Sequence, residues 1–314
     1  MRPTGQGVIA VVDGEGSRTA TEEKVPQGKS SGGSAPRDPQ GSKGSGKLKD
    51  LAVRAVSGVA YAVVFFVCLL WGEVPTAVFM AVESVLCCHE FFHMMRKSGK
   101  MPNMYIGLVA AAMFPLCALG ASLWLIFQLF LLLFAVGIWY VYTPRTRIED
   151  VCITVFGPLY TGLMLSNVVL LRGYIAGWEG GLLCVGVVGS VMASDSLAYL
   201  VGGRFGSHKM APKISPHKTW EGFFGGIAGC VLVWIILWVV QLYDLGLLYA
   251  ILCGVVVSVF GVFGDLIESR IKRGVGVKDS GKLMPGHGGM LDRSDSLIFA
   301  GVAARFLLVV GGVI

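Results

Sequence analysis

The chain has 314 residues, of which 54% are hydrophobic and only 15% are charged. A soluble protein of this length keeps about a quarter of its residues charged, so the composition excludes an ordinary soluble protein and predicts an integral membrane protein. The net charge of +6 comes from Lys and Arg scattered over short loops between apolar runs, which is typical of cytoplasmic membrane-protein loops and argues against nucleic-acid binding.

The first 47 residues differ in composition from the rest. Their last part, GKSSGGSAPRDPQGSKGSGK, consists of Gly, Ser, Pro and charged residues with nothing to bury. We expect residues 1–47 to form a disordered tail, without the apolar core of a signal peptide. Residues 48–314 would then form one transmembrane domain, with its catalytic half at about residues 190–296.

Nine apolar segments follow, each near the roughly 20 residues that a helix needs to cross the hydrocarbon core. They predict an all-α polytopic membrane protein with about nine transmembrane helices. The third and fourth segments are closely joined, so eight spans remain an alternative. The predicted spans are 51–71, 75–95, 103–121, 123–143, 151–171, 180–201, 221–242, 246–268 and 295–314.

The distribution of Lys and Arg orients these segments. Loops rich in Lys and Arg alternate with loops that have one or none, through all nine segments. By the positive-inside rule the N-terminus is cytoplasmic and the C-terminus external. The two longest loops, which follow the sixth and eighth segments, then share the cytoplasmic face.

The second segment contains HEFFH, residues 89–93, a pattern that can bind zinc on a helix and supply a glutamate base. An intramembrane zinc protease also needs a third ligand, for which Asp292 is a candidate. However, the neighbouring Arg293 opposes zinc binding, and two His and one Glu at fixed spacing arise by chance. We interpret HEFFH as accidental. Glu83, in the same segment, has no clear partner in the sequence.

The loop after the sixth segment reads SDSLAYLVGGRFGSHKMAPKISPHKTWEGFFGG, residues 194–226. Asp195 lies near the membrane boundary, where an ionisable side chain is costly and usually functional. Ser215 and Thr219 could bind phosphate or cap the seventh helix.

The last loop concentrates ionisable residues more densely. Asp265 and Glu268 are three residues apart at the end of an apolar helix and therefore share a face. Carboxylates beside many cations suit Mg²⁺ held between protein and phosphates. A solvated loop with balancing charges is the alternative, which the density of acids and bases disfavours.

The residues from 269 to 295, SRIKRGVGVKDSGKLMPGHGGMLDRSD, resemble the signature of the phosphatidate cytidylyltransferase (CDP-diacylglycerol synthase) family. Residues 194–226 are similar to a second block of that family. Met284 and Ser294 depart mildly from the residues usual there, and neither carries a charge. The resemblance covers the C-terminal 120 residues well, whereas the earlier helices match only in their general apolar character.

The resemblance implies that CTP and phosphatidate react to CDP-diacylglycerol and pyrophosphate at a Mg²⁺-dependent site. Two divalent ions, or one divalent and one monovalent ion, would fit. Asp265 and Asp292 are the leading metal ligands, with Glu268 and Asp295 secondary. The catalytic candidates are Asp265, Asp292, Lys218 and His287, of which His287 could instead only stabilise a glycine-rich turn.

Both substrates are anionic, so the cations should divide between the triphosphate and the lipid phosphate. The candidate substrate-binding residues are Asp195, Arg204, Lys209, Lys213, Ser215, Thr219, Lys272, Arg273, Lys278, Asp279 and Arg293.

Other functions stay open from sequence. A transporter would explain many helices but not a polar loop outside the hydrocarbon, and no repeat relates the two halves. A CTP-dependent lipid kinase would transfer the γ-phosphate and release CDP. We expect an integral membrane protein of a bacterial inner membrane with its active site on the cytoplasmic side. Its partners would be CTP, phosphatidate and membrane lipid, and a homodimer is left open.

Overall fold

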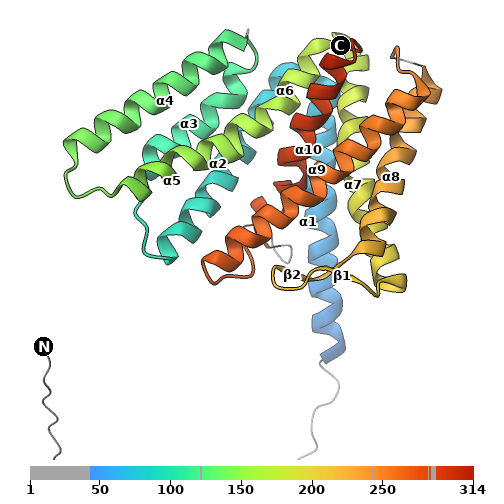
Figure 1. Cartoon of the computed structure of the whole chain (residues 1–314), viewed down its shortest axis with the longest axis horizontal. Helices are drawn as coiled ribbons and strands as arrows, with labels where there is room; N and C mark the ends of the chain where they lie inside the picture. Colours follow the sequence, from blue (N-terminus) through green and yellow to red (C-terminus); the bar gives the residue numbers. More distant parts are fainter. Residues whose placement is uncertain (1–42, 121, 242, 282, 284–287) are drawn as a thin grey trace, which may run out of the picture. The chain divides into compact units, whose positions relative to one another are not determined.

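The computed structural model describes residues 43–120, 122–241, 243–281, 283 and 288–314, with side chains described from residue 56 onward (Figure 1). The described residues are mostly helical. The helices are α1 (Lys43–Trp71), α2 (Glu73–Lys97), α3 (Met104–Cys117), α4 (Ser122–Tyr142), α5 (Ile148–Pro158), the π-helical η1 (Leu159–Leu163), α6 (Met164–Tyr174), α7 (Gly177–Phe205), α8 (Trp220–Val240), α9 (Leu247–Gly274) and α10 (Leu291–Val310). The predicted tail lies outside these residues up to residue 42, and residues 43–47 belong to α1.

Each predicted apolar segment coincides with a helix or, for residues 151–171, with the continuous run α5–η1–α6. Pro158 ends α5. Pro158 has no N–H for a helical hydrogen bond to the Thr154 carbonyl oxygen, and the π-helical turn η1 follows it.

Six helical stretches among the described residues are long and apolar enough to cross a membrane. The most apolar part of α4 has only 22% of its residues buried inside the protein, and that of α8 only 28%. Large apolar side chains that face outward on helices of this length are expected where lipid surrounds them. The chain is therefore a helical membrane protein, although α3 is an apolar helix of only 14 residues.

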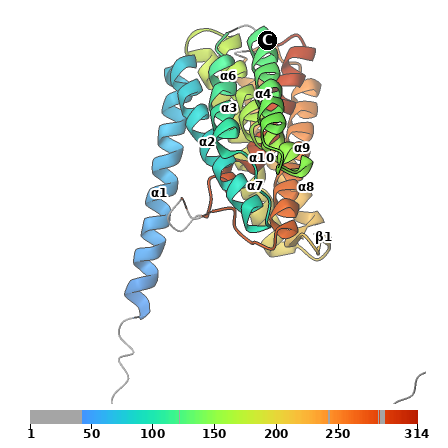
Figure 2. The ribbon, with the colours of Figure 1, turned by 90° about the vertical axis from the view of Figure 1, so that its left-hand side faces the viewer.

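The helices pack as two neighbouring groups (Figure 1). In one, α2 packs against α3 and α6, and α4 packs on α3 and α5. In the other, α8 packs between α7 and α9, and α9 packs against α10. Helix α10 also contacts α2 and α6, and so joins the groups. Helix α1 runs along one side (Figure 2).

Helices α7 and α8 lie close to each other because small residues face each other across their contact. A Cβ atom on Gly222 would lie 2.8 Å from the Ala198 carbonyl oxygen, and one on Gly229 would lie 2.8 Å from the Ala193 carbonyl oxygen. Small residues at such spacings let helix backbones approach closely in membranes.

A short hairpin departs from the all-α expectation. Strands β1 (Lys209–Ala211) and β2 (Ser215–Thr219) pair antiparallel between α7 and α8, with an irregularity between Lys209 and Ala211. Thr219 ends β2 and caps α8, because its hydroxyl accepts a hydrogen bond from the Gly222 N–H at 3.2 Å. The hairpin therefore leads directly into the capped start of α8.

Glu83 of α2, which the sequence leaves without a partner, joins three helices. Its Oε1 accepts hydrogen bonds from the Tyr61 hydroxyl at 3.0 Å and from the Ser294 hydroxyl at 2.5 Å. A buried carboxyl group needs such donors. The contact ties α1 and α2 to the helix that carries the signature acids.

Candidate active site

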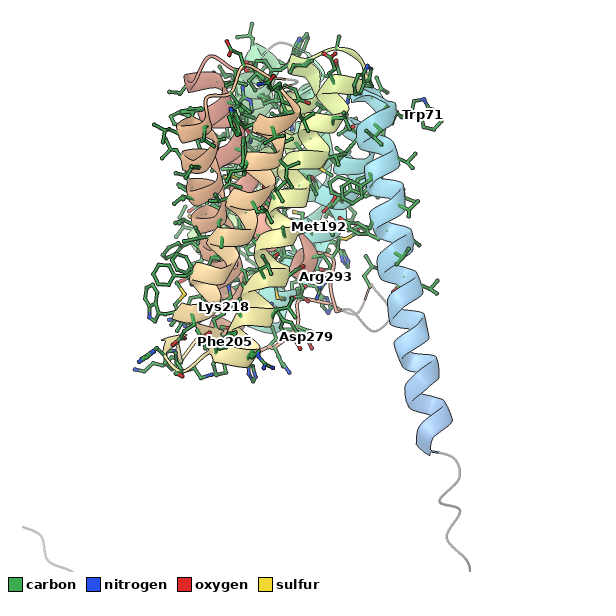
Figure 3. All side chains as sticks on the ribbon, turned by 90° about the vertical axis from the view of Figure 1, so that its right-hand side faces the viewer. Trp71, Met192, Phe205, Lys218, Asp279 and Arg293 are labelled. Atoms are coloured by element: carbon green, nitrogen blue, oxygen red, sulfur yellow. The ribbon has the colours of Figure 1, made fainter. Side chains whose placement is uncertain are left out.

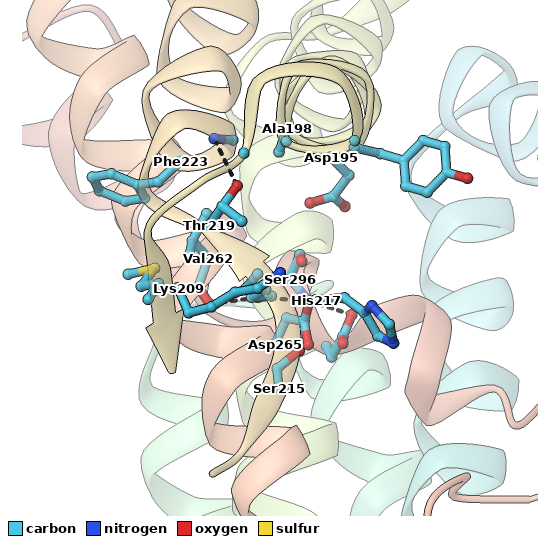
Figure 4. A pocket seen from close by; sticks show the side chains of 18 of the residues that line it. Asp195, Ala198, Lys209, Ser215, His217, Thr219, Phe223, Val262, Asp265 and Ser296 are labelled. Carbon is cyan, nitrogen blue, oxygen red and sulfur yellow. Dashed lines mark hydrogen bonds and ion pairs between the residues drawn. The ribbon is translucent and has the colours of Figure 1, made fainter. Parts of the chain in front are cut away.

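A cavity of about 770 Å³ lies where α7, the hairpin, α8, α9 and α10 meet (Figure 4). Lys218, Phe205 and Asp279 lie toward the end of the bundle opposite Trp71 (Figure 3). The site is thus near one end of the helices. Its lining includes most predicted site residues, namely Asp195, Lys209, Ser215, Lys218, Thr219, Asp265, Lys272, Asp279, Asp292, Arg293 and Asp295.

Three carboxyl groups form the centre of the site. Asp265 and Glu268 come from α9 and Asp295 from α10, and one oxygen of each lies within 4.8 Å of the others. Glu268 is completely buried. Its Oε1 has no hydrogen-bond partner among the described residues. Because a buried carboxylate oxygen without a partner is costly, a cation is the natural partner.

Lys218 of β2 contacts this group directly. Its Nζ lies 2.7 Å from Asp265 Oδ2 and donates to the Val262 carbonyl oxygen at 3.3 Å. The other oxygen of Asp265 accepts from the Ser269 hydroxyl at 3.1 Å. The hairpin thereby brings a cation to the acids of α9.

Asp292 lies in the first turn of α10 and is held by several donors. Its Oδ2 accepts from the Gly289 N–H at 2.8 Å, and its Oδ1 lies 2.6 Å from Lys272 Nζ. The Ser280 N–H donates to both of its oxygens, at 3.3 and 3.2 Å. Asp292 therefore lies beside the three-acid group and organises the loop before α10.

Lys272 connects the two sets of acids. Its ammonium group forms ion pairs with both Glu268 and Asp292, and its side chain is 10% exposed. The sequence assigned Lys272 to substrate binding. In the structure it lines the cavity but is engaged with two buried carboxyl groups, so its first effect is to neutralise them.

Five other predicted residues in the described part of the chain are not in this lining, and Glu268, buried within the three-acid group, is one of them. Arg273 donates to the carbonyl oxygens of Ile214 and Val277 and so ties the hairpin to the end of α9. Arg204, Lys213 and Lys278 are exposed. His287 lies outside the described residues.

Sequence reasoning missed several cavity residues. Tyr199 of α7, His217 of β2 and Phe223 of α8 all line the cavity. Their positions next to matched motif residues could have indicated them, but an aromatic side chain in a membrane protein carries little specific signal.

The side chains of HEFFH lie in different surroundings. His89 and His93 are exposed, with ring centroids 6.3 Å apart. Glu90 is buried and bonded to the loop before α10. A zinc protease would need the two imidazoles and the glutamate at one site. This geometry supports the interpretation that HEFFH is not a zinc motif.

The donor set fits a hard divalent cation. All three clustered ligands are carboxylate oxygens, which suit Mg²⁺, and Asp292 lies next to them. Asp265, one of the two leading ligands of the sequence assignment, lies with Glu268 and Asp295. Asp292, the other, accepts hydrogen bonds from Lys272 and the Gly289 N–H. The ligand assignment itself stays a prediction.

Acids and cations gathered at one end of membrane helices are typical of a membrane-embedded enzyme that acts on phosphates. Comparison with known proteins identifies the family of the chain. A model of the cytidylyltransferase family matches residues 52–310, so the chain belongs to that family. This confirms the resemblance seen in the signature.

Several relatives align over most of the chain. Phosphatidate cytidylyltransferase of Bacillus subtilis (strain 168) is 32% identical over 273 residues, which cover 83% of this chain and 98% of the relative. Phosphatidate cytidylyltransferase 4, chloroplastic, of Arabidopsis thaliana is 33% identical over 82% of this chain and 73% of its own. The Mycobacterium bovis phosphatidate cytidylyltransferase is 30% identical over 83% of this chain and 89% of its own.

Proposed function

We propose that this chain is a phosphatidate cytidylyltransferase, which converts CTP and phosphatidate to CDP-diacylglycerol and pyrophosphate. The observation that carries the proposal is the cavity in which Asp265, Asp292 and Lys218 meet at one end of apolar helices. The signature residues and the relatives that align over most of the chain support it.

The cavity suits two anionic substrates. Lys209, Lys218 and Arg293 line it, together with the first residues of α8 and α10. Helix N-termini carry partial positive charge and free N–H groups, and therefore attract phosphates. Cations and helix ends together reduce the repulsion between lipid phosphate and triphosphate.

The proposed chemistry is attack of a phosphatidate oxygen on the α-phosphorus of CTP, with pyrophosphate leaving. The chain's part is to hold both phosphates in line and to stabilise the charge that develops on the leaving group. Lys218, anchored between Asp265 and the Val262 carbonyl oxygen, is held in place for that task.

Asp265, Glu268 and Asp295 would hold a Mg²⁺ ion, and Asp292 is the neighbouring candidate ligand for a second divalent or a monovalent ion. Bound there, Mg²⁺ would polarise the phosphoryl oxygens and neutralise their charge.

The proposal includes a topology and a location. Nine spans with a cytoplasmic N-terminus would put the hairpin and the signature loop on the cytoplasmic side, where CTP is available. The basic residues of both loops support this orientation. A bacterial inner membrane fits the two bacterial relatives described above. The homodimer stays a prediction, which light scattering of the detergent-solubilised protein tests.

The test is a product assay on detergent-purified protein supplied with CTP, phosphatidate and Mg²⁺. We expect pyrophosphate and CDP-diacylglycerol from wild type and from His89→Ala, but not from Asp292→Asn. Folded wild-type protein that makes no lipid nucleotide would refute the proposal. Cleavage of a transmembrane peptide in the presence of zinc would then be the next assay.

A further inference from the structure

The glutamate of HEFFH has no role in the proposed function so far, yet it is among the most buried carboxyl groups of the described residues. Glu90 is 5% exposed. It belongs to α2, far from the signature in sequence. Helix α2 contacts α10, so Glu90 lies beside the loop that precedes α10.

Glu90 bonds to both ends of that loop. Its Oε2 accepts hydrogen bonds from the Ser280 hydroxyl at 3.1 Å and from the Leu291 N–H at 2.9 Å. Ser280 precedes the loop 281–290, and Leu291 is the first residue of α10. One oxygen atom therefore fastens the beginning of the loop to its end.

Backbone N–H groups near the same two ends also donate hydrogen bonds to Asp292. The Ser280 N–H donates to Asp292, and the Gly289 N–H donates to Asp292 Oδ2 at 2.8 Å. Asp292 thus holds the loop from the cavity side, while Glu90 holds it from the α2 side. If Glu90 released its two donors, Ser280 and Leu291 could separate and Asp292 would lose its fixed position.

Two glycines of the signature fit against Glu90. A Cβ atom on Gly281 would lie 2.2 Å from Glu90 Oε1, and one on Gly289 would lie 2.4 Å from Glu90 Oε2. A side chain at either position would therefore have to displace the Glu90 carboxyl group from its present place. The glutamate of α2 thereby gives a physical reason for glycine at two positions of a motif that lies about 190 residues later.

We propose that Glu90 is a positioning residue for cytidylyl transfer. By joining Ser280 to Leu291 it holds Ser280 at the start of α10 and keeps Asp292 and Arg293 on the wall of the cavity. This inference rests on the proposed function for its kinetic consequence, whereas its structural consequence can be measured without any substrate.

The kinetic test compares Glu90→Ala with Glu90→Gln. Alanine removes the acceptor, and we expect kcat to fall about 10- to 100-fold, as for other residues that orient a catalytic group, with a smaller change in KM for CTP. Glutamine keeps one oxygen for both donors, and its amide nitrogen replaces Oε1, which has no hydrogen-bond partner among the described residues. Glu90→Gln should therefore recover most of kcat.

The structural test is hydrogen–deuterium exchange of the peptides that span residues 275–295. We expect faster exchange at Leu291, Gly289 and Ser280 in Glu90→Ala, and near wild-type exchange in Glu90→Gln. His89→Ala is the matched control, because His89 is the neighbouring residue but is exposed. It should change neither kcat nor exchange.

If Glu90→Ala does not fold, Ser280→Ala removes one of the two hydrogen bonds and should show the same changes in weaker form. Unchanged kcat or unchanged exchange in the folded alanine variant would overturn the inference, as would a glutamine variant as impaired as the alanine variant. Failure of the proposed function is separate, since wild type itself would then make no CDP-diacylglycerol.

Discussion

Lys272 is the residue on which the charge balance of the site depends. It is paired with Glu268, which is completely buried, and with Asp292, whose side chain is 10% exposed. A buried ion pair adds little net stability, but removal of one partner leaves an uncompensated charge. Lys272 is therefore the cation that these two neighbouring carboxyl groups share.

The change Lys272→Met tests this role. It should lower the free energy of unfolding by about 3–5 kcal/mol, because two buried carboxyl groups lose their common cation. Thermal and denaturant unfolding in detergent measure the effect. Lys278→Met, at an exposed position six residues later, is the control and should leave stability unchanged. Equal stability of the two variants would contradict the proposed charge balance.

The change Asp265→Asn tests the three-acid group. It removes a proposed metal ligand and the ion pair with Lys218 at 2.7 Å. We expect the transfer rate to fall by at least about 100-fold and the Mg²⁺ concentration for half-maximal rate to rise. Initial rates of pyrophosphate release over a Mg²⁺ series provide the measurement. Asp244→Asn, an exposed position between α8 and α9, is the control. An unchanged Mg²⁺ requirement would show that Asp265 is not a ligand.

At this scale the sequence indicated which residues gather at the cavity but not how most of them pair. The family resemblance selected Asp265, Lys218 and Asp292, and the cavity brings all three together. The pair of Lys272 with Glu268, four residues earlier on α9, agrees with helical spacing. The pair of Lys272 with Asp292 and the hydrogen bonds of Glu90 instead join residues far apart in the chain. Local spacing contains no information on those contacts.

The α7–α8 pair is the element whose packing shapes the cavity. Small residues of α7 face Gly222, Gly226 and Gly229 of α8, and the hairpin between the two helices supplies Lys209 and Lys218. The distance between these helices therefore determines where the ammonium groups of Lys209 and Lys218 lie.

The change Gly229→Ala tests this close approach. The new Cβ would lie 2.7 Å from Leu197 Cδ1 and 2.8 Å from the Ala193 carbonyl oxygen, so the helices must move apart. We expect a loss of about 1–3 kcal/mol in the free energy of unfolding, as for other overpacked sites. Gly189→Ala in α7 is the matched control, because its Cβ would meet no atom within 4 Å. Equal stability of both variants would argue against tight α7–α8 packing.

Apolar runs of about 20 residues predicted the helices well, since a membrane helix needs a continuous apolar stretch. The same runs could not reveal the hairpin. Strand β1 has only three residues, and neither strand shows a clear alternation of polar and apolar side chains. The pairing of the two strands is stabilised by the position of the hairpin between α7 and α8.

At the scale of the whole molecule, orientation in the membrane decides which compartment supplies the substrates. The proposed orientation places the exposed Lys213 of the hairpin and Lys278 of the signature loop on the cytoplasmic side. Trypsin added to inside-out vesicles should therefore cleave after these residues, whereas sealed right-side-out vesicles should be protected. Detergent-opened right-side-out vesicles are the control. Cleavage in sealed right-side-out vesicles would reverse the proposed orientation.

The most direct measurement of the account is the fate of each phosphorus atom of CTP. Purified protein would receive phosphatidate, Mg²⁺ and CTP labelled at either the α- or the γ-phosphorus. Phosphatidate cytidylyl transfer predicts that the α label enters the lipid product and the γ label leaves as pyrophosphate. Label from the γ-phosphorus in the lipid, with CDP released, would contradict the account and identify a CTP-dependent lipid kinase.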